Sequence, residues 1–167
     1  APGPRVGRQE IGATSALTGL TRALPARFDA QSYVVRYRTP GVDGQLTTAS
    51  GAVWFPVGAT GPLPMVVYLH GTITSKTDAP SVGTSQEALF GAGYASDGSV
   101  AVLPDFLGLG VAGTDTYHPY LHLQTQSSAS VDLMRAARTL AQQLGVTLDR
   151  RNLFVTGYSQ GGGAAMG

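Results

Sequence analysis

Residues 153–163 read Leu-Phe-Val-Thr-Gly-Tyr-Ser-Gln-Gly-Gly-Gly, and this stretch decides the fold. Its first four residues are apolar or β-branched, which favours a buried strand. Glycines at 157 and 161 bracket Ser159, so the chain can turn sharply there and enter a helix. The pattern G-x-S-x-G in this strand–turn–helix setting is typical of a nucleophile elbow, in which the serine hydroxyl is exposed above a sheet.

Two further apolar runs precede this stretch, at residues 65–69 and 100–103, and both are typical of strands covered on both faces. A short helix is predicted around residues 85–90. A longer helix is predicted over 128–144, with Gly145 as its C-cap and an apolar stripe formed by Val131, Met134, Ala137, Leu140, Ala141 and Leu144. This alternation of strands and helices predicts a parallel sheet with right-handed crossovers.

The first part of the chain has a different pattern. Residues 31–39 and 46–57 are rich in β-branched and aromatic residues and flank a Pro/Gly turn, so they predict an antiparallel hairpin with Gly51 as a candidate bulge. Before it we expect an extended arm over residues 1–10 and a short helix over 11–24. The predicted organisation is therefore an arm and helix in residues 1–30, followed by residues 31–167 as the N-terminal part of one α/β domain.

Composition excludes several classes of protein. The chain has 167 residues, of which 43% are hydrophobic, enough for a globular core. Only 13% are charged and the net charge is +1, with the basic residues scattered, which argues against a nucleic-acid partner. No apolar run approaches the roughly 18 residues of a transmembrane segment. The start at Ala1 rather than Met favours a mature end left by removal of a signal peptide, so we expect a secreted protein.

The chain resembles the N-terminal portion of α/β-hydrolases, and more narrowly the secreted lipase- and esterase-like hydrolases of bacteria and fungi. The resemblance extends from about Tyr33 to the end of the chain and rests on SGAVWFP at 50–56, YLHGT at 68–72, PDFLGLG at 104–110, HPYLH at 118–122, DLMRAAR at 132–138 and GYSQGG at 157–162. The GYSQG motif alone also resembles cutinases, but those carry disulfides and this chain has no cysteine. The implied fold is an α/β-hydrolase with a mainly parallel sheet and an N-terminal antiparallel hairpin, incomplete after the nucleophile elbow.

The resemblance implies a serine hydrolase that acts on carboxylic esters through an acyl-enzyme on Ser159. The backbone N–H groups of Thr72 and Gln160 would hold the oxyanion. His70 is expected to pack beneath the oxyanion loop, because the general base in this layout follows the nucleophile. The expected substrate is a small-molecule or lipid ester, and no metal or organic cofactor is needed.

One feature departs from the family pattern. These hydrolases order their triad as Ser, then Asp or Glu, then His, yet no acidic residue or histidine follows Ser159. We therefore expect a C-terminal remainder of the same protein, possibly as a second chain, to supply the acid, the base and the remaining strands, and this chain alone to be inactive. Two alternatives stay open. The chain is a non-catalytic half-domain that serves as a binding or assembly module, or it is a peptidase or acyltransferase on the same fold.

Two other motifs favour structural explanations. Residues 108–113 match G-x-G-x-x-G with Asp132 beyond, but loop-forming residues follow where a dinucleotide site needs a helix. We interpret them as a loop at the carboxyl ends of the strands. His118 and His122 are four residues apart, a spacing that suits metal ligands on a helix. Pro119 lies between them and no third ligand is apparent, so structural histidines are the better interpretation.

Four more side chains have simple expected roles. Asp105 follows a strand and is expected to cap the turn after it. Trp54 on the hairpin is expected to pack in the core rather than to stack on a substrate. Lys76 and Asp78 are expected to be solvated charges in the loop after the oxyanion motif.

Overall fold

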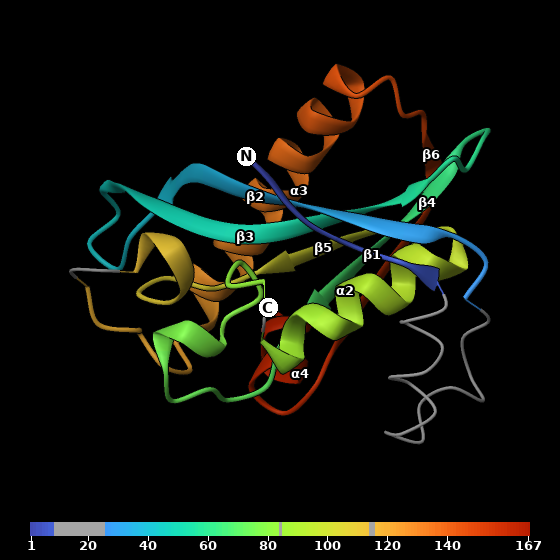
Figure 1. Ribbon diagram of the computed structural model, residues 1–167. Coiled ribbons are helices and arrows are strands. Elements are labelled where there is room, and N and C mark those ends of the chain that lie inside the picture. The colour runs from blue at the N-terminus through green and yellow to red at the C-terminus, as the bar shows by residue number, and fades with distance from the viewer. Residues whose placement is uncertain (9–25, 84, 114–115) are drawn as a thin grey trace.

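The computed structural model describes residues 1–8, 26–83, 85–113 and 116–167. One sheet contains the six strands β1 (Pro2–Val6), β2 (Asp29–Pro40), β3 (Leu46–Val57), β4 (Leu63–Leu69), β5 (Val100–Pro104) and β6 (Leu148–Gly157). Their order across the sheet is β1-β2-β3-β5-β4-β6 (Figure 1). The apolar runs at 65–69, 100–103 and 153–156 all form strands, as predicted, and so do both arms of the hairpin.

The sheet is mixed, so the expected α/β class is confirmed, and the expectation of a mainly parallel sheet is met only in part. Strands β4 and β5 pair in parallel, and so do β4 and β6. The pairs β1–β2, β2–β3 and β3–β5 are antiparallel. The hairpin arms extend the sheet through β3, which pairs directly with β5. The long hairpin therefore contributes more strand pairing than the sequence pattern indicated.

Helices cover both faces of this sheet (Figure 1). Helix α3 (Leu123–Gln143) packs on one face, and α2 (Gln86–Asp97) packs on the other, where Trp54 is buried against it. Trp54 is thus a packing residue, as expected. Helix α3 begins five residues before the predicted start, because the side chain of His122 caps it. Its fully buried positions are Ala129, Leu133, Ala137 and Ala141, whereas Val131 and Leu144 of the predicted stripe are exposed.

The extended arm predicted over residues 1–10 contains β1, whose residues 2–6 pair with β2. One expectation about the first 60 residues needs correction. Gly51 is not a bulge, since the β2–β3 register runs through it without a shift. A Cβ on Gly51 would lie 2.4 Å from Leu133 and 2.6 Å from the carbonyl oxygen of Leu103, so glycine is needed there for close packing. The helix predicted over 11–24 lies outside the described residues.

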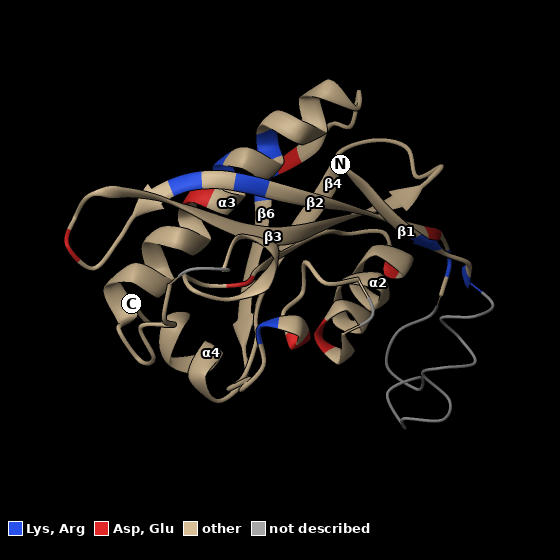
Figure 2. Ribbon diagram, turned by 60° about the vertical axis from the view of Figure 1, so that its left-hand side comes forward, with Lys and Arg blue, Asp and Glu red and all other residues tan. Residues whose placement is uncertain are grey.

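Charged residues are sparse and spread over several elements, as Figure 2 shows. Arg36 and Arg38 of β2 are exposed, while Tyr37 between them is buried. Within the described residues, no helix is long and apolar enough to cross a bilayer.

Candidate functional site

Ser159 occupies the corner between β6 and α4 (Gln160–Ala164). Its backbone has φ 52° and ψ −113°, a conformation that non-glycine residues rarely adopt. The side chain is exposed and does not cap the helix that follows. In the described structure no hydrogen bond involves its hydroxyl. This is the strained, outward-facing serine that a nucleophile elbow requires.

The two glycines of the motif allow this corner to pack tightly. A Cβ on Gly157 would lie 2.2 Å from the carbonyl oxygen of Gly161. A Cβ on Gly161 would lie 1.9 Å from the carbonyl oxygen of Leu69, at the end of β4. Side chains at these positions are excluded by backbone atoms, which cannot move away as a flexible side chain can. The glycines therefore set how closely the elbow approaches β4.

The loop that follows β4 lies against the elbow. The backbone N–H of Tyr158 donates to the carbonyl oxygen of Leu69 at 3.2 Å, and the Tyr158 ring lies directly over Gly71. In the described part of the chain, neither the N–H of Thr72 nor that of Gln160 donates a hydrogen bond. Among the described residues, both N–H groups are thus without a hydrogen-bond acceptor.

His70 is buried beneath this loop, as expected. Its Nδ1 lies 2.7 Å from the carbonyl oxygen of Gly71, and its Nε2 lies 3.0 Å from the carbonyl oxygen of Asp105. The ring also contacts Phe106, with 4.6 Å between the ring centroids. His70 thereby ties the loop after β4 to the loop after β5.

Asp105 does more than cap the following turn, which corrects the expectation for it. Its buried carboxylate accepts hydrogen bonds from the Ser50 hydroxyl at 2.5 Å and the Ser81 backbone N–H at 2.8 Å. The two serine hydroxyls in turn accept from the backbone N–H groups of Val111 and Ala112. Burial raises the pKa of Asp105, and the hydrogen bonds from both serines oppose that rise. The carboxylate is therefore an internal anchor for residues 105–112.

Residues 116–122 contact the side chains of Gln160 and Thr72. His118 Nε2 lies 2.7 Å from Nε2 of Gln160, and His118 Nδ1 lies 2.8 Å from the carbonyl oxygen of Leu107. The Tyr120 hydroxyl lies 2.9 Å from the Thr72 hydroxyl. Burial lowers the pKa of His118. Sequence reasoning used HPYLH as part of a resemblance and interpreted its two histidines as structural, so it missed the contacts of His118 and Tyr120. A histidine and a tyrosine two residues apart in that loop were the available signal.

The other residues singled out in the sequence have structural surroundings. His122 caps α3 through Thr125, so the two histidines of HPYLH face different partners. The Lys76 ammonium donates to the carbonyl oxygens of Gly113 and Thr116, so it is not simply a solvated charge. The glycines of 108–113 form a turn and a short 3-10 helix, as the loop interpretation requires.

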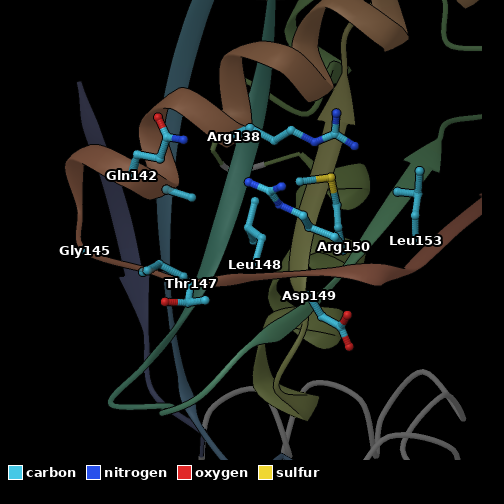
Figure 3. Close-up of a pocket in the computed structure, with 11 residues that line it drawn as sticks. Arg138, Gln142, Gly145, Thr147, Leu148, Asp149, Arg150 and Leu153 are labelled. Atoms are coloured by element: carbon cyan, nitrogen blue, oxygen red, sulfur yellow. The ribbon is translucent and has the colours of Figure 1, made fainter.

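One cavity among the described residues is remote from Ser159. It has a volume of about 730 Å³ and lies between the end of α3 and the start of β6 (Figure 3). Arg138, Leu148 and Arg150 are among the side chains around it. Because β6 runs from this cavity to the elbow, the two lie at opposite ends of the strand. The cavity therefore takes no part in the site around Ser159.

Solved structures of hydrolases match this chain closely. A protein of Legionella pneumophila described as a hydrolase has a TM-score of 0.91 and 32% identity, covering 98% of this chain and 44% of that protein. The rice cell wall degrading esterase LipA from Xanthomonas oryzae has a TM-score of 0.82 and 33% identity over 99% of this chain and 42% of its own. Lipase A from Candida antarctica, at 18% identity and a TM-score of 0.58, covers 98% of this chain and 35% of its own and shares the fold.

The chain thus spans less than half the length of these three proteins. No protein-family model and no curated protein sequence matches it. The strained serine corner, the mixed sheet with helices on both faces and these structural matches together show that the chain has an α/β-hydrolase fold of the esterase and lipase type.

Proposed function

We propose that the protein hydrolyses carboxylic esters with Ser159 as its nucleophile. The observation that carries this proposal is the exposed Ser159 side chain at a backbone φ of 52°, at a corner where Tyr158 packs against Gly71. An exposed serine at such a corner, with the N–H groups of Thr72 and Gln160 as the proposed oxyanion donors, suits acyl transfer. The same corner would serve peptide bonds or acyl acceptors other than water, and the esterase and lipase named above favour esters.

The reaction follows from this geometry. Ser159 Oγ bonds to the ester carbonyl carbon while a base takes its proton, and the carbonyl π pair moves onto oxygen. The N–H groups of Thr72 and Gln160 hold that oxyanion. Collapse breaks the bond to the alcohol, which leaves with the proton from the base. Water then attacks the acyl-enzyme in the same manner, releasing the acid and restoring the serine.

The general base of this reaction is proposed to lie outside these 167 residues. The chain has three histidines, and each has other hydrogen-bond partners: two carbonyl oxygens for His70, Leu107 and Gln160 for His118, and Thr125 for His122. The solved hydrolases that match are more than twice as long as the part they share with this chain. A histidine and its carboxylate partner from a C-terminal region, in the same or a second chain, would complete the triad.

Phosphonate labelling tests the proposal. The full-length gene product and the 167-residue chain are each incubated with a fluorophosphonate and analysed by intact mass. We expect the full-length product to gain one phosphonyl group on Ser159 and to lose it in Ser159→Ala, and the 167-residue chain to remain unlabelled. A full-length product without label, or one labelled equally in Ser159→Ala, would contradict the proposal.

A second candidate function rests on β6. Leu153, Phe154 and Val155 on this edge strand are 42%, 54% and 49% exposed, an unusual apolar surface for a soluble domain. That surface suits a half-domain that assembles with a complementary chain. Ser159-dependent turnover of an aryl ester by the 167-residue chain without any companion would exclude this alternative.

Secretion is also proposed, because LipA is named for a cell-wall substrate, which lies outside cells.

A further inference from the structure

Residues 116–122 contact both residues that would form the oxyanion hole, although Thr72 and Gln160 lie far apart in the sequence. Tyr120 contacts the side chain of Thr72, and His118 contacts that of Gln160. We propose that His118 and Tyr120 are positioning residues that set the spacing of the two oxyanion donors, so that segment 116–122 acts as a clamp on the oxyanion hole. This inference rests on the proposed function of Ser159.

The neighbours of His118 determine which of its two ring nitrogens carries the proton. A carbonyl oxygen can only accept a hydrogen bond, so Leu107 requires the proton on Nδ1 of His118. In the neutral ring, Nε2 is then an acceptor. The group 2.7 Å away on Gln160 is its amide nitrogen, which donates. The neutral Nδ1–H tautomer therefore determines which way the Gln160 amide points.

Gln160 depends on this one contact. Its side chain is only 3% exposed, and Oε1 has no hydrogen-bond partner among the described residues. The Nε2–His118 bond is thus the polar contact that holds the side chain in place. Because the side chain and the backbone N–H belong to the same residue at the first position of a five-residue helix, fixing one restricts the other.

Hydrogen bonds and ring packing within segment 116–122 fix the position of Tyr120 relative to His118. Tyr120 N–H donates to the carbonyl oxygen of His118 at 2.8 Å, and His122 N–H donates to that of Pro119 at 3.1 Å. The His118 and Tyr120 rings meet edge to face, with their centroids 6.1 Å apart. The segment is therefore a compact turn rather than an open loop.

Both ends of the segment are also anchored. The ammonium of Lys76 donates to the carbonyl oxygen of Thr116, and Lys76 lies four residues after Thr72 in the same loop. At the other end His122 caps α3 through Thr125. A clamp with fixed ends and two side chains in contact with the two donors can hold their spacing during catalysis, which lowers the reorganisation needed to bind an oxyanion.

The test compares His118→Phe and Tyr120→Phe in the full-length gene product with an aryl ester substrate. Phe at 118 keeps the ring packed on Phe106 but leaves the Gln160 amide unpaired, and Phe at 120 removes one hydroxyl. Loss of a whole oxyanion donor lowers kcat by about 10²–10³-fold, so we expect about a tenfold loss or more for His118→Phe, a smaller loss for Tyr120→Phe, and KM within about twofold of wild type. Tyr117→Phe, which removes a hydroxyl from a side chain that is 99% exposed, is the matched control and should retain kcat.

Nitrogen NMR of the His118 ring provides a readout that does not depend on turnover. We expect a protonated Nδ1 and an unprotonated Nε2 at neutral pH. Protonation of Nε2 there would overturn the inference, and so would unchanged kcat in both Phe variants of an enzyme whose wild type turns over. If the wild type shows neither turnover nor labelling at Ser159, the proposed function fails and the inference with it, so the two failures are distinguishable.

Discussion

The carbonyl oxygen of Leu69 lies 1.9 Å from the point that a Cβ atom on Gly161 would occupy, so the serine corner and the end of β4 share one tightly packed backbone contact. We expect Gly161→Ala to destabilise the fold by about 3 kcal/mol, because neither backbone can move without breaking strand pairing. Gly162→Ala is the control. Its nearest atom would be 3.7 Å away, and alanine should be neutral or stabilising by up to about 1 kcal/mol in a helix. Urea unfolding curves of the two variants decide; equal stability would contradict the contact.

Ser159 stores backbone strain that glycine would release. At most positions Ala is more stabilising than Gly, but at φ 52° the Cβ atom is unfavourable. We expect Ser159→Gly to be more stable than Ser159→Ala by about 1 kcal/mol, although both lack the hydroxyl. Thermal unfolding of the two variants measures the difference. The usual order, with Ala the more stable, would show that the corner is not strained.

Asp105 gives the fold a pH dependence in the acidic range. Because burial raises its pKa in the folded state, the folded protein holds this proton more strongly than the unfolded chain does. Stability should therefore fall as pH rises from 3.8 through the folded pKa. The readout is the difference in unfolding free energy between wild type and Asp105→Asn across pH. A difference that does not change with pH would contradict the assigned direction. Asp29 and Asp149 have lowered pKa values, so their changes come below 3.8.

His118 should contribute the opposite slope. Burial lowers its pKa from 6.5, so below that pH the unfolded chain takes up the proton first and the folded state loses stability. We expect acid destabilisation below pH 6.5 to be weaker in His118→Phe than in wild type. Gly162→Ala, which changes no titratable group, should keep the wild-type slope. Chemical unfolding at a series of pH values measures all three, and equal slopes for wild type and His118→Phe would count against the assigned shift.

Local patterns sufficed for most of the strands and for the serine corner. Apolar runs such as residues 65–69 are typical of strands that are covered on both faces of the sheet. A G-x-S-x-G pattern directly after such a run is compatible with few geometries other than a strand–turn–helix corner. Strand β1 was missed because Pro2 and Pro4 lack the N–H groups that a strand pattern normally offers, and it is tolerated only at an edge.

Contacts between distant segments were not accessible to the same reasoning. The Gln160–His118 bond joins residues 42 positions apart, and the four partners of the Asp105 network come from three separate segments. Nothing in the local sequence states that Ser50 and Ser81 will meet Asp105. The Gly51 expectation failed for the same reason, since the need for glycine comes from Leu133 on α3 rather than from its own strand.

The place of β4 between β5 and β6 has a consequence for biosynthesis. The last residue pair between β4 and β6 joins Leu69 to Gly157, which are 88 residues apart in the sequence (157 minus 69). At ribosomal rates of about 5–20 residues per second, those residues take roughly 4 to 18 s to make, longer than many small domains need to fold. During that interval one edge of an apolar strand, Met-Val-Val-Tyr-Leu at 65–69, lacks its partner. The serine corner can therefore form only after β6 has been synthesised and has paired with β4.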